Sequence, residues 1–243
     1  MISYKPMSDK PSVRSPWFWV PSLYFAQGIP YVAVMIVSVL MYKRLGVSNT
    51  DIALYTSWLN LPWVIKPFWS PFVDLLKTKR WWVATMQLLI GAGLAGVAFT
   101  IPTTFFFQAS LAVFWLLAFS SATHDIAADG FYMLALDSHE QAFFVGIRST
   151  FYRIAIIAGQ GVLVMFAGFL ENSTGNIPLA WSVTFFILGG LFLALFLYHR
   201  YILPLPKGDK LSATVTPSTI LKEFFATFAS FFKKKQAFVA ILF

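Results

Sequence analysis

The sequence contains no cysteine, which excludes disulfide bonds, thiol catalysis and cysteine-ligated metal sites. Charged residues make up only 12% of the 243 positions, whereas an ordinary globular domain has about 25%. The three histidines, His124, His139 and His199, are too scattered to indicate a zinc site. A G-x-x-x-x-G-K-[ST] loop is also missing, so an ATP-driven pump subunit is unsupported. We therefore predict no catalytic residues, no metal and no cofactor.

Apolar residues, by contrast, account for 58% of the chain and gather in long runs. A helix needs roughly 20 apolar residues to cross a hydrocarbon core of about 30 Å. Runs of this kind predict membrane-spanning helices over residues 17–41, 52–72, 81–101, 104–124, 145–169 and 180–199. An outer-membrane barrel would show short alternating segments instead. The predicted fold class is an all-α membrane protein, with a bundle of six transmembrane helices over residues 1–202.

A net charge of +8 raises the question of a nucleic-acid partner, and the placement of the basic residues argues against one. In the six-helix topology, only Lys43 and Arg44 fall in loops on one side of the membrane. The basic residues on the other side are Lys5, Lys10, Arg14, Lys77, Lys79, Arg80, Arg200, Lys207, Lys210, Lys222, Lys233, Lys234 and Lys235. The positive-inside rule predicts that this second side, with the amino terminus, is cytoplasmic.

One long polar stretch interrupts the apolar pattern. Residues 203–235 contain three prolines and a lysine triplet, which predicts a cytoplasmic linker between two membrane blocks. A new apolar run begins after it, and we interpret residues 236–243 as the start of a seventh transmembrane helix. The chain is therefore expected to be one half of a longer protein.

The third apolar run contains a formal match to the dinucleotide-binding pattern G-x-G-x-x-G, at Gly91, Gly93 and Gly96. That pattern requires a preceding strand and an acidic residue about 20 positions later, and neither is present. Small residues four positions apart instead allow two helices to approach closely. We predict that these glycines pack against a neighbouring helix.

Charges inside apolar spans are the main functional signal, because a charge in hydrocarbon is costly and rarely kept without a role. Asp125 and Asp129 lie four residues apart near the end of the fourth span, so a helix places both carboxylates on one face. Two like charges in a low dielectric raise the pKa of at least one carboxyl, so that a proton could be taken up or released there, with His124 beside them. A solvated helix end is the alternative interpretation.

Three basic residues could complete this site. Lys66 could pair with Asp125 or Asp129, or its long stem could reach the membrane interface. Arg148 lies near the rim of the fifth span, whereas Arg153 lies deeper. An arginine there offers a planar charged fork suited to a carboxylate or phosphate of a ligand, or to a partner aspartate.

Three segments carry a resemblance to a known family. KPFWSPFVD at 66–74, THDIAADGF at 123–131 and STFYRIAIIAGQG at 149–161 together resemble the AmpG-type permeases, in the peptide, acetyl-coenzyme A and drug branch of the major facilitator superfamily. The resemblance covers essentially the whole chain. Of the superfamily signature between the second and third spans, Asp74, Lys79 and Arg80 remain as a candidate gating loop.

The resemblance implies an amino-terminal half of a twelve-helix fold in a bacterial inner membrane. Its partners would be protons, membrane lipid, a carboxy-terminal half and a small molecule, with proton-coupled import of anhydromuropeptides from peptidoglycan recycling as the activity. Lys66, Asp125, Asp129 and Arg153 match the family's motif positions. A carrier for acetyl-coenzyme A or another anionic metabolite, a membrane-embedded enzyme using His124 and Asp125, and a passive scaffold are the alternatives.

Overall fold

The computed structural model describes residues 14–206, 208, 209 and 225. These residues form helices and connecting loops, and the described part of the chain contains no strand. The helical elements are, in order, η1 (Pro16–Phe18), α1 (Val20–Val32), η2 (Ala33–Val37), α2 (Ser38–Arg44), α3 (Asn49–Thr56), η3 (Ser57–Asn60), α4 (Leu61–Val64), η4 (Lys66–Phe68), α5 (Ser70–Leu76), α6 (Lys79–Thr100), α7 (Phe106–Ala135), α8 (Ser138–Ala158), η5 (Gly159–Leu163), α9 (Val164–Thr174) and α10 (Ile177–Ile202).

Within the described residues, five continuous helical segments are long and apolar enough to cross a membrane. They are Pro16–Arg44, Lys79–Thr100, Phe106–Ala135, Ser138–Thr174 and Ile177–Ile202. This confirms the predicted class, an all-α membrane protein. The fourth predicted span extends past residue 124 to Ala135, so Asp125 and Asp129 lie within the helix and not at its end.

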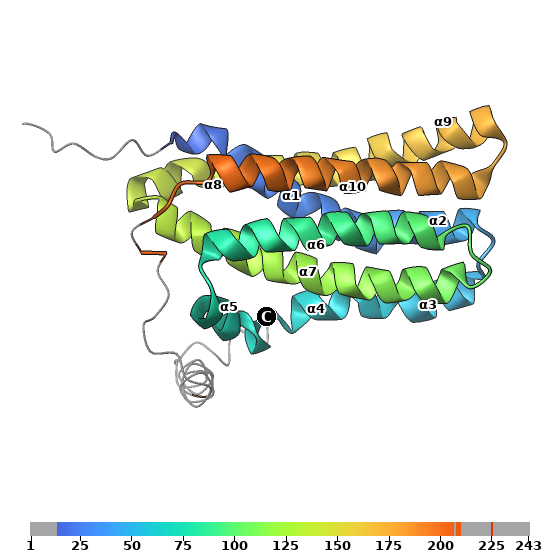
Figure 1. Cartoon of the computed structure of the whole chain (residues 1–243), viewed down its shortest axis with the longest axis horizontal. Coiled ribbons are helices and arrows are strands. Elements are labelled where there is room, and N and C mark those ends of the chain that lie inside the picture. Colours follow the sequence, from blue (N-terminus) through green and yellow to red (C-terminus); the bar gives the residue numbers. More distant parts are fainter. Residues whose placement is uncertain (1–13, 207, 210–224, 226–243) are drawn as a thin grey trace, which may run out of the picture.

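The predicted span at 52–72 is not a single helix, and a count of six membrane-spanning helices is not confirmed. Short helices from α3 to α5 replace it, with breaks in helical geometry at Ile65 and Trp69. Pro62, Pro67 and Pro71 explain the interruptions, because proline lacks the N–H that a helix interior needs. In Figure 1 these pieces lie along α7 and return the chain from the α2 end of the bundle to the start of α6.

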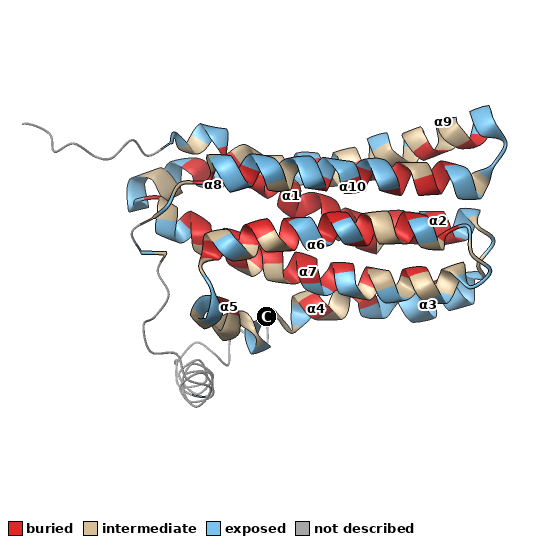
Figure 2. Ribbon diagram, viewed as in Figure 1, coloured by how far each residue is buried: buried red, intermediate tan, exposed pale blue. Residues whose placement is uncertain are grey.

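The long helices lie side by side in an elongated bundle (Figure 1). Helix α6 packs most extensively against α10 and α7, and α1 packs against α8. Figure 2 shows buried residues on the inward faces of these helices and exposed residues on their outer faces. Exposed apolar side chains such as Phe99, Ile157 and Met165 suit a surface that faces lipid.

The glycines of the third apolar run make the close helix contact that the sequence predicts. A Cβ atom added at Gly91 would lie 3.2 Å from the backbone oxygen of Gly189, and one added at Gly189 would lie 3.0 Å from that of Gly91. A Cβ at Gly93 would lie 2.7 Å from Leu117. Helix α6 therefore approaches α10 and α7 closely because these positions have no side chain.

The predicted division at residue 202 coincides with the end of α10. The interpretations of residues 203–235 as a linker and of 236–243 as the start of a further helix lie outside the described residues, except for 203–206, 208, 209 and 225.

Candidate functional site

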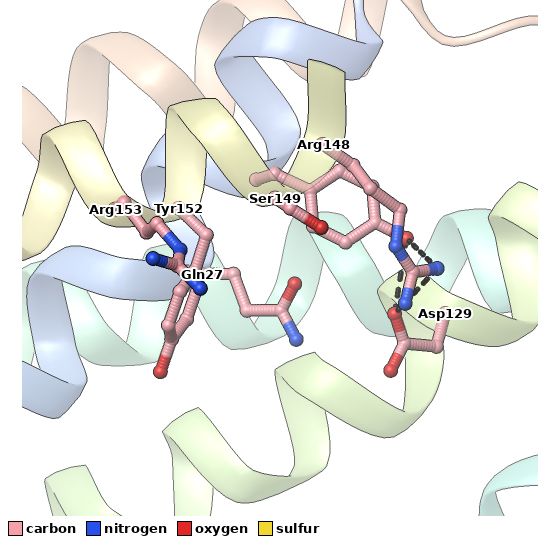
Figure 3. A pocket seen from close by; sticks show the side chains of 7 residues that line it. Gln27, Asp129, Arg148, Ser149, Tyr152 and Arg153 are labelled. Carbon is pink, nitrogen blue, oxygen red and sulfur yellow. Dashed lines mark hydrogen bonds and ion pairs between the residues drawn. The ribbon is translucent and has the colours of Figure 1, made fainter. Parts of the chain in front are cut away.

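Helices α1, α7 and α8 enclose a polar cavity of about 340 Å³. Its lining residues are Tyr24, Gln27, Asp129, Arg148, Ser149, Tyr152 and Arg153. Figure 3 shows the side chains of Arg148, Ser149, Tyr152 and Arg153 extending from α8 along one wall, with Gln27 and Asp129 facing them. The spacing of four residues between Arg148 and Tyr152 places both on the face of α8 that meets α1.

Asp129 is held at the cavity by an arginine and a tyrosine. Arg148 Nη1 lies 3.6 Å from Asp129 Oδ1, and the Tyr24 hydroxyl donates to the same oxygen at 3.0 Å (Figure 3). Arg148 Nη1 also donates to the Tyr24 hydroxyl oxygen at 3.1 Å, and its guanidinium stacks over the rings of Tyr24 and Tyr132. These contacts join α1, α7 and α8 through one partly exposed ion pair.

Asp125 points to a different partner, although it lies only one turn from Asp129. Its Oδ2 accepts hydrogen bonds from Lys66 Nζ at 2.7 Å and from Trp63 Nε1 at 3.1 Å. The broken segment supplies both donors, since Trp63 lies in α4 and Lys66 begins η4. Asp125 is 6% exposed, and its Oδ1 accepts no hydrogen bond from any residue that the structure describes. Gln27 and Tyr152, which line the cavity, lie beside this carboxylate, and the side-chain amide of Gln27 is near enough to interact with it as a donor.

Arg153 lines the same cavity but has no carboxylate partner among the described residues. Its side chain extends beside Tyr152 (Figure 3). Arg148, Arg153 and Asp129 are the charged residues that line the cavity, while the ion pair of Lys66 with Asp125 lies beside it, outside this lining. With both carboxylates ionised, one positive charge is uncompensated.

His124 lies outside this cavity, in a buried hydrogen-bonded chain that joins four helices. Its Nε2 lies 3.1 Å from Gln87 Nε2, and the Gln87 amide contacts His199 Nδ1 at 2.9 Å. His199 Nε2 in turn lies 3.0 Å from Ser22 Oγ. Gln87, His124 and His199 are fully buried. The geometry therefore gives His124 a place in a contact between α6, α7, α10 and α1 and brings it to no substrate-accessible surface.

Replacing Gln87 should destabilise the bundle. In Gln87→Leu both histidines lose their shared partner, and leaving a buried polar group unsatisfied costs about 1–3 kcal/mol. In detergent, the unfolding temperature of this variant should be clearly lower than that of the unaltered protein. Ser182→Ala is the control, because that buried hydroxyl has no hydrogen-bond partner among the described residues. Equal unfolding temperatures for the two variants would contradict the linking role of Gln87.

The candidate gating residues surround the turn between α5 and α6. Asp74 pairs with Lys79. Arg80 donates instead to the backbone oxygen of Arg200 at the end of α10. Both oxygens of Asp209 accept from the first backbone N–H groups of α6, at Lys79 and Arg80, with distances of 2.6 and 3.0 Å. The turn is therefore tied to the chain that follows α10.

Several residues around the charges carried little signal in the sequence. Trp63 is one of several tryptophans in the apolar runs, and its indole N–H donates to Asp125. Tyr24 and Gln27 were visible only as polar residues three apart in an apolar helix, a spacing that places them on one face. Gln87 is a lone amide in an apolar run, and its partner His199 is 112 residues away in sequence. Isolated polar residues within apolar runs were therefore the only feature of the sequence that could have indicated these contacts.

The long apolar helices, the buried carboxylate of Asp125 and the charged cavity beside it define a multi-pass membrane protein. The sequence model described as the BT1 family matches residues 25–229. The chain therefore belongs to the BT1 family.

Similar proteins carry names of transporters. A protein of Rickettsia conorii provisionally named transporter AmpG 4 is 27% identical over 234 residues, covering 90% of this chain and 53% of that protein. The anhydromuropeptide permease of Escherichia coli strain K12 is 24% identical over 228 residues, covering 90% of this chain and 43% of the permease. An uncharacterized protein of Schizosaccharomyces pombe is 28% identical over 145 residues, which cover 54% of this chain and 28% of that protein. The chain spans about half the length of the first two relatives.

Proposed function

We propose that this chain is the amino-terminal half of a secondary transporter that imports anhydromuropeptides together with protons across a bacterial inner membrane. The observation that carries the proposal is the charged cavity between α1, α7 and α8, lined by Asp129, Arg148 and Arg153, with the ion pair of Lys66 and Asp125 beside it. The names of the relatives support both transport and the class of solute. The carboxy-terminal half would supply the facing wall of the cavity.

Arg153 would bind the anionic part of the solute. Its guanidinium faces the cavity without an internal carboxylate partner among the described residues, whereas Lys66 and Arg148 each have one. Anhydromuropeptides carry peptide carboxylates, and an arginine fork binds a carboxylate through two parallel hydrogen bonds. Tyr152 and Gln27 offer further hydrogen-bonding groups beside it.

Asp125 would carry the coupled proton. Its Oδ2 is engaged by Lys66 and Trp63, while its buried Oδ1 has no donor among the residues described, so Oδ1 is the atom open to a proton. A neutral carboxyl would hold Lys66 less tightly, because the attraction between unlike charges would be lost. Lys66 could then turn toward the solute. In this cycle the proton and the anionic solute enter together.

The orientation follows from the basic residues. Arg14, Lys77, Lys79, Arg80 and Arg200 lie at the end of the bundle where α6 begins and α10 ends, while Lys43 and Arg44 lie at the other end (Figure 1). The positive-inside rule therefore supports a cytoplasmic amino terminus.

Substituting Arg153 should weaken solute binding. A hydrogen bond to a charged group contributes about 1.5–3 kcal/mol, so Arg153→Gln in the complete permease should raise the dissociation constant for anhydromuropeptide by about tenfold or more. Arg153→Lys keeps the charge but not the planar fork, so its dissociation constant should lie between those of the unaltered protein and Arg153→Gln. Calorimetry on the purified protein measures the dissociation constants of both variants.

Lys43→Gln is the matched control, because it removes one positive charge at the opposite end of the bundle, where Lys43 Nζ donates to Asn49 Oδ1 at 2.6 Å and pairs with no carboxylate of the described residues. Titrating the protein with acetyl-coenzyme A as well distinguishes a muropeptide carrier from a carrier of anionic metabolites. Tighter binding of acetyl-coenzyme A than of muropeptide would favour the anionic-metabolite carrier, and identical affinities for Arg153→Gln and Lys43→Gln would remove Arg153 from the site.

A further inference from the structure

A second cavity, of about 800 Å³, lies between the first turns of α6 and the last turns of α10. This place is at the basic end of the bundle and away from the cavity that contains Arg153. Arg80 and Arg200 line its polar part. Nothing in the transport cycle proposed above uses it.

The charge around this cavity is strongly unbalanced. The guanidinium of Arg80 is repelled by both Arg200 and Arg14, and Asp209 is the carboxylate that attracts it. Both oxygens of Asp209 already accept from backbone N–H groups of α6. Nε of Arg80 is buried and has no hydrogen-bond partner within the described part of the chain. Two arginines and one engaged carboxylate therefore line the cavity, with Arg14 adding positive charge nearby, and Nε of Arg80 has no partner among the described residues.

The walls change from polar to apolar in the same direction on both helices. On α6, Trp81, Thr85 and Leu88 lie on one face because their spacing is four and three residues. On α10, Arg200 lies four residues beyond Phe196. Since the helices are antiparallel, Arg200 lies near Arg80 and Trp81, while Phe196 and Leu88 lie deeper along the bundle.

Aromatic side chains mark the depth of this groove. Trp81 is 44% exposed and Tyr201 is 71% exposed, and both line the cavity. Tryptophan and tyrosine concentrate at the level of the lipid headgroups. The guanidinium groups are therefore at headgroup depth, and Leu88 is at the depth of the acyl chains.

We propose that this groove between α6 and α10 binds an anionic membrane phospholipid. Its phosphate lies between Arg80 and Arg200, and an acyl chain follows Leu88 and Phe196. A basic pocket between transmembrane helices is a known type of site for anionic headgroups. The apolar continuation of the groove favours a phospholipid over a free phosphate ion, because the ion has no acyl chain to occupy it.

Brominated lipids test this site through Trp81. The purified protein and its Trp81→Phe variant are placed in phosphatidylcholine vesicles that contain increasing fractions of brominated phosphatidylglycerol or brominated phosphatidylcholine. The difference between the two proteins reports the quenching of Trp81. With about 1 kcal/mol for each basic residue near the surface, half-maximal quenching should need a brominated phosphatidylglycerol fraction at least about fivefold lower than that of brominated phosphatidylcholine.

Arg200→Gln should reduce this preference about fivefold while leaving the fold intact, because Arg80 contacts the backbone oxygen of Arg200 and not its side chain. Lys43→Gln removes the same charge at the other end of the bundle and should keep the full preference. Equal quenching by the two lipids in the unaltered protein, or equal effects of the two substitutions, overturns the proposal. Displacement of the lipid by millimolar inorganic phosphate would also overturn it, since the site would then be one for the free ion.

Discussion

Asp125→Asn should abolish proton-dependent muropeptide uptake by the complete permease, to the background of cells that lack it. Asparagine keeps the size of the side chain and an oxygen that can accept from Trp63, but it cannot take up or release a proton at the position of Oδ1. It also leaves Lys66 without its carboxylate partner. Uptake of labelled anhydromuropeptide at an imposed proton gradient measures the effect.

Loss of uptake must be separated from loss of folding. Removing one partner of a buried ion pair costs about 3–5 kcal/mol, so the amount of folded protein has to be measured in each variant. Lys66→Met combined with Asp125→Leu removes both charges and should restore stability without restoring uptake. Asp51→Asn, which neutralises an exposed carboxylate at the far end of the bundle, should leave uptake unchanged. Uptake at the normal rate in Asp125→Asn would exclude this residue from coupling.

Gly28→Val should cause a large loss of stability. A Cβ atom at Gly28 would lie 2.7 Å from the Cβ of Ala155 and 2.8 Å from the backbone oxygen of Tyr152. Backbone atoms of α8 cannot move aside without displacing the helix, so α1 and α8 would have to separate. Overpacking of this kind typically costs about 1–3 kcal/mol. The melting temperature should fall, and muropeptide binding should weaken because Tyr152 lines the cavity.

Gly146→Val is the matched control, because Gly146 also lies in α8 and a Cβ there would have no atom within 4 Å. Combining Gly28→Val with Ala155→Gly should recover part of the loss, since it removes the methyl contact but keeps the contact with the Tyr152 oxygen. If Gly28→Val and Gly146→Val melt at the same temperature, the close contact of α1 with α8 is not important for stability.

The long helices were predictable because a bilayer requires long apolar runs, and such runs are visible in any sequence. The exception at 52–72 has a local cause. Hydropathy is similar for a continuous helix and for one broken at Ile65 and Trp69, so the apolar run alone could not distinguish them. The prolines in this segment indicated where helical hydrogen bonds would be missing, but not how the pieces would be arranged.

The charges of the site were visible in the sequence, whereas their pairing was not. Asp125 and Asp129 lie one turn apart, yet α7 lies between the broken segment and α8, so each carboxylate meets a cation from a different side. His124 and Asp125 are neighbours in sequence, but successive residues of a helix point about 100° apart, and only Asp125 comes near the cavity. Partners more than 50 residues apart depend on the rotation of each helix, which hydropathy does not specify.

Proton movement driven by the solute is the most direct measurement of coupling through Asp125. The complete permease is reconstituted into vesicles with a pH-sensitive dye inside, and anhydromuropeptide is added outside without an imposed gradient. The proposed cycle predicts acidification of the interior in step with uptake by the unaltered protein, and no acidification with Asp125→Asn. Muropeptide uptake without any change in internal pH, or equal acidification in the Asp125→Asn variant, would contradict it.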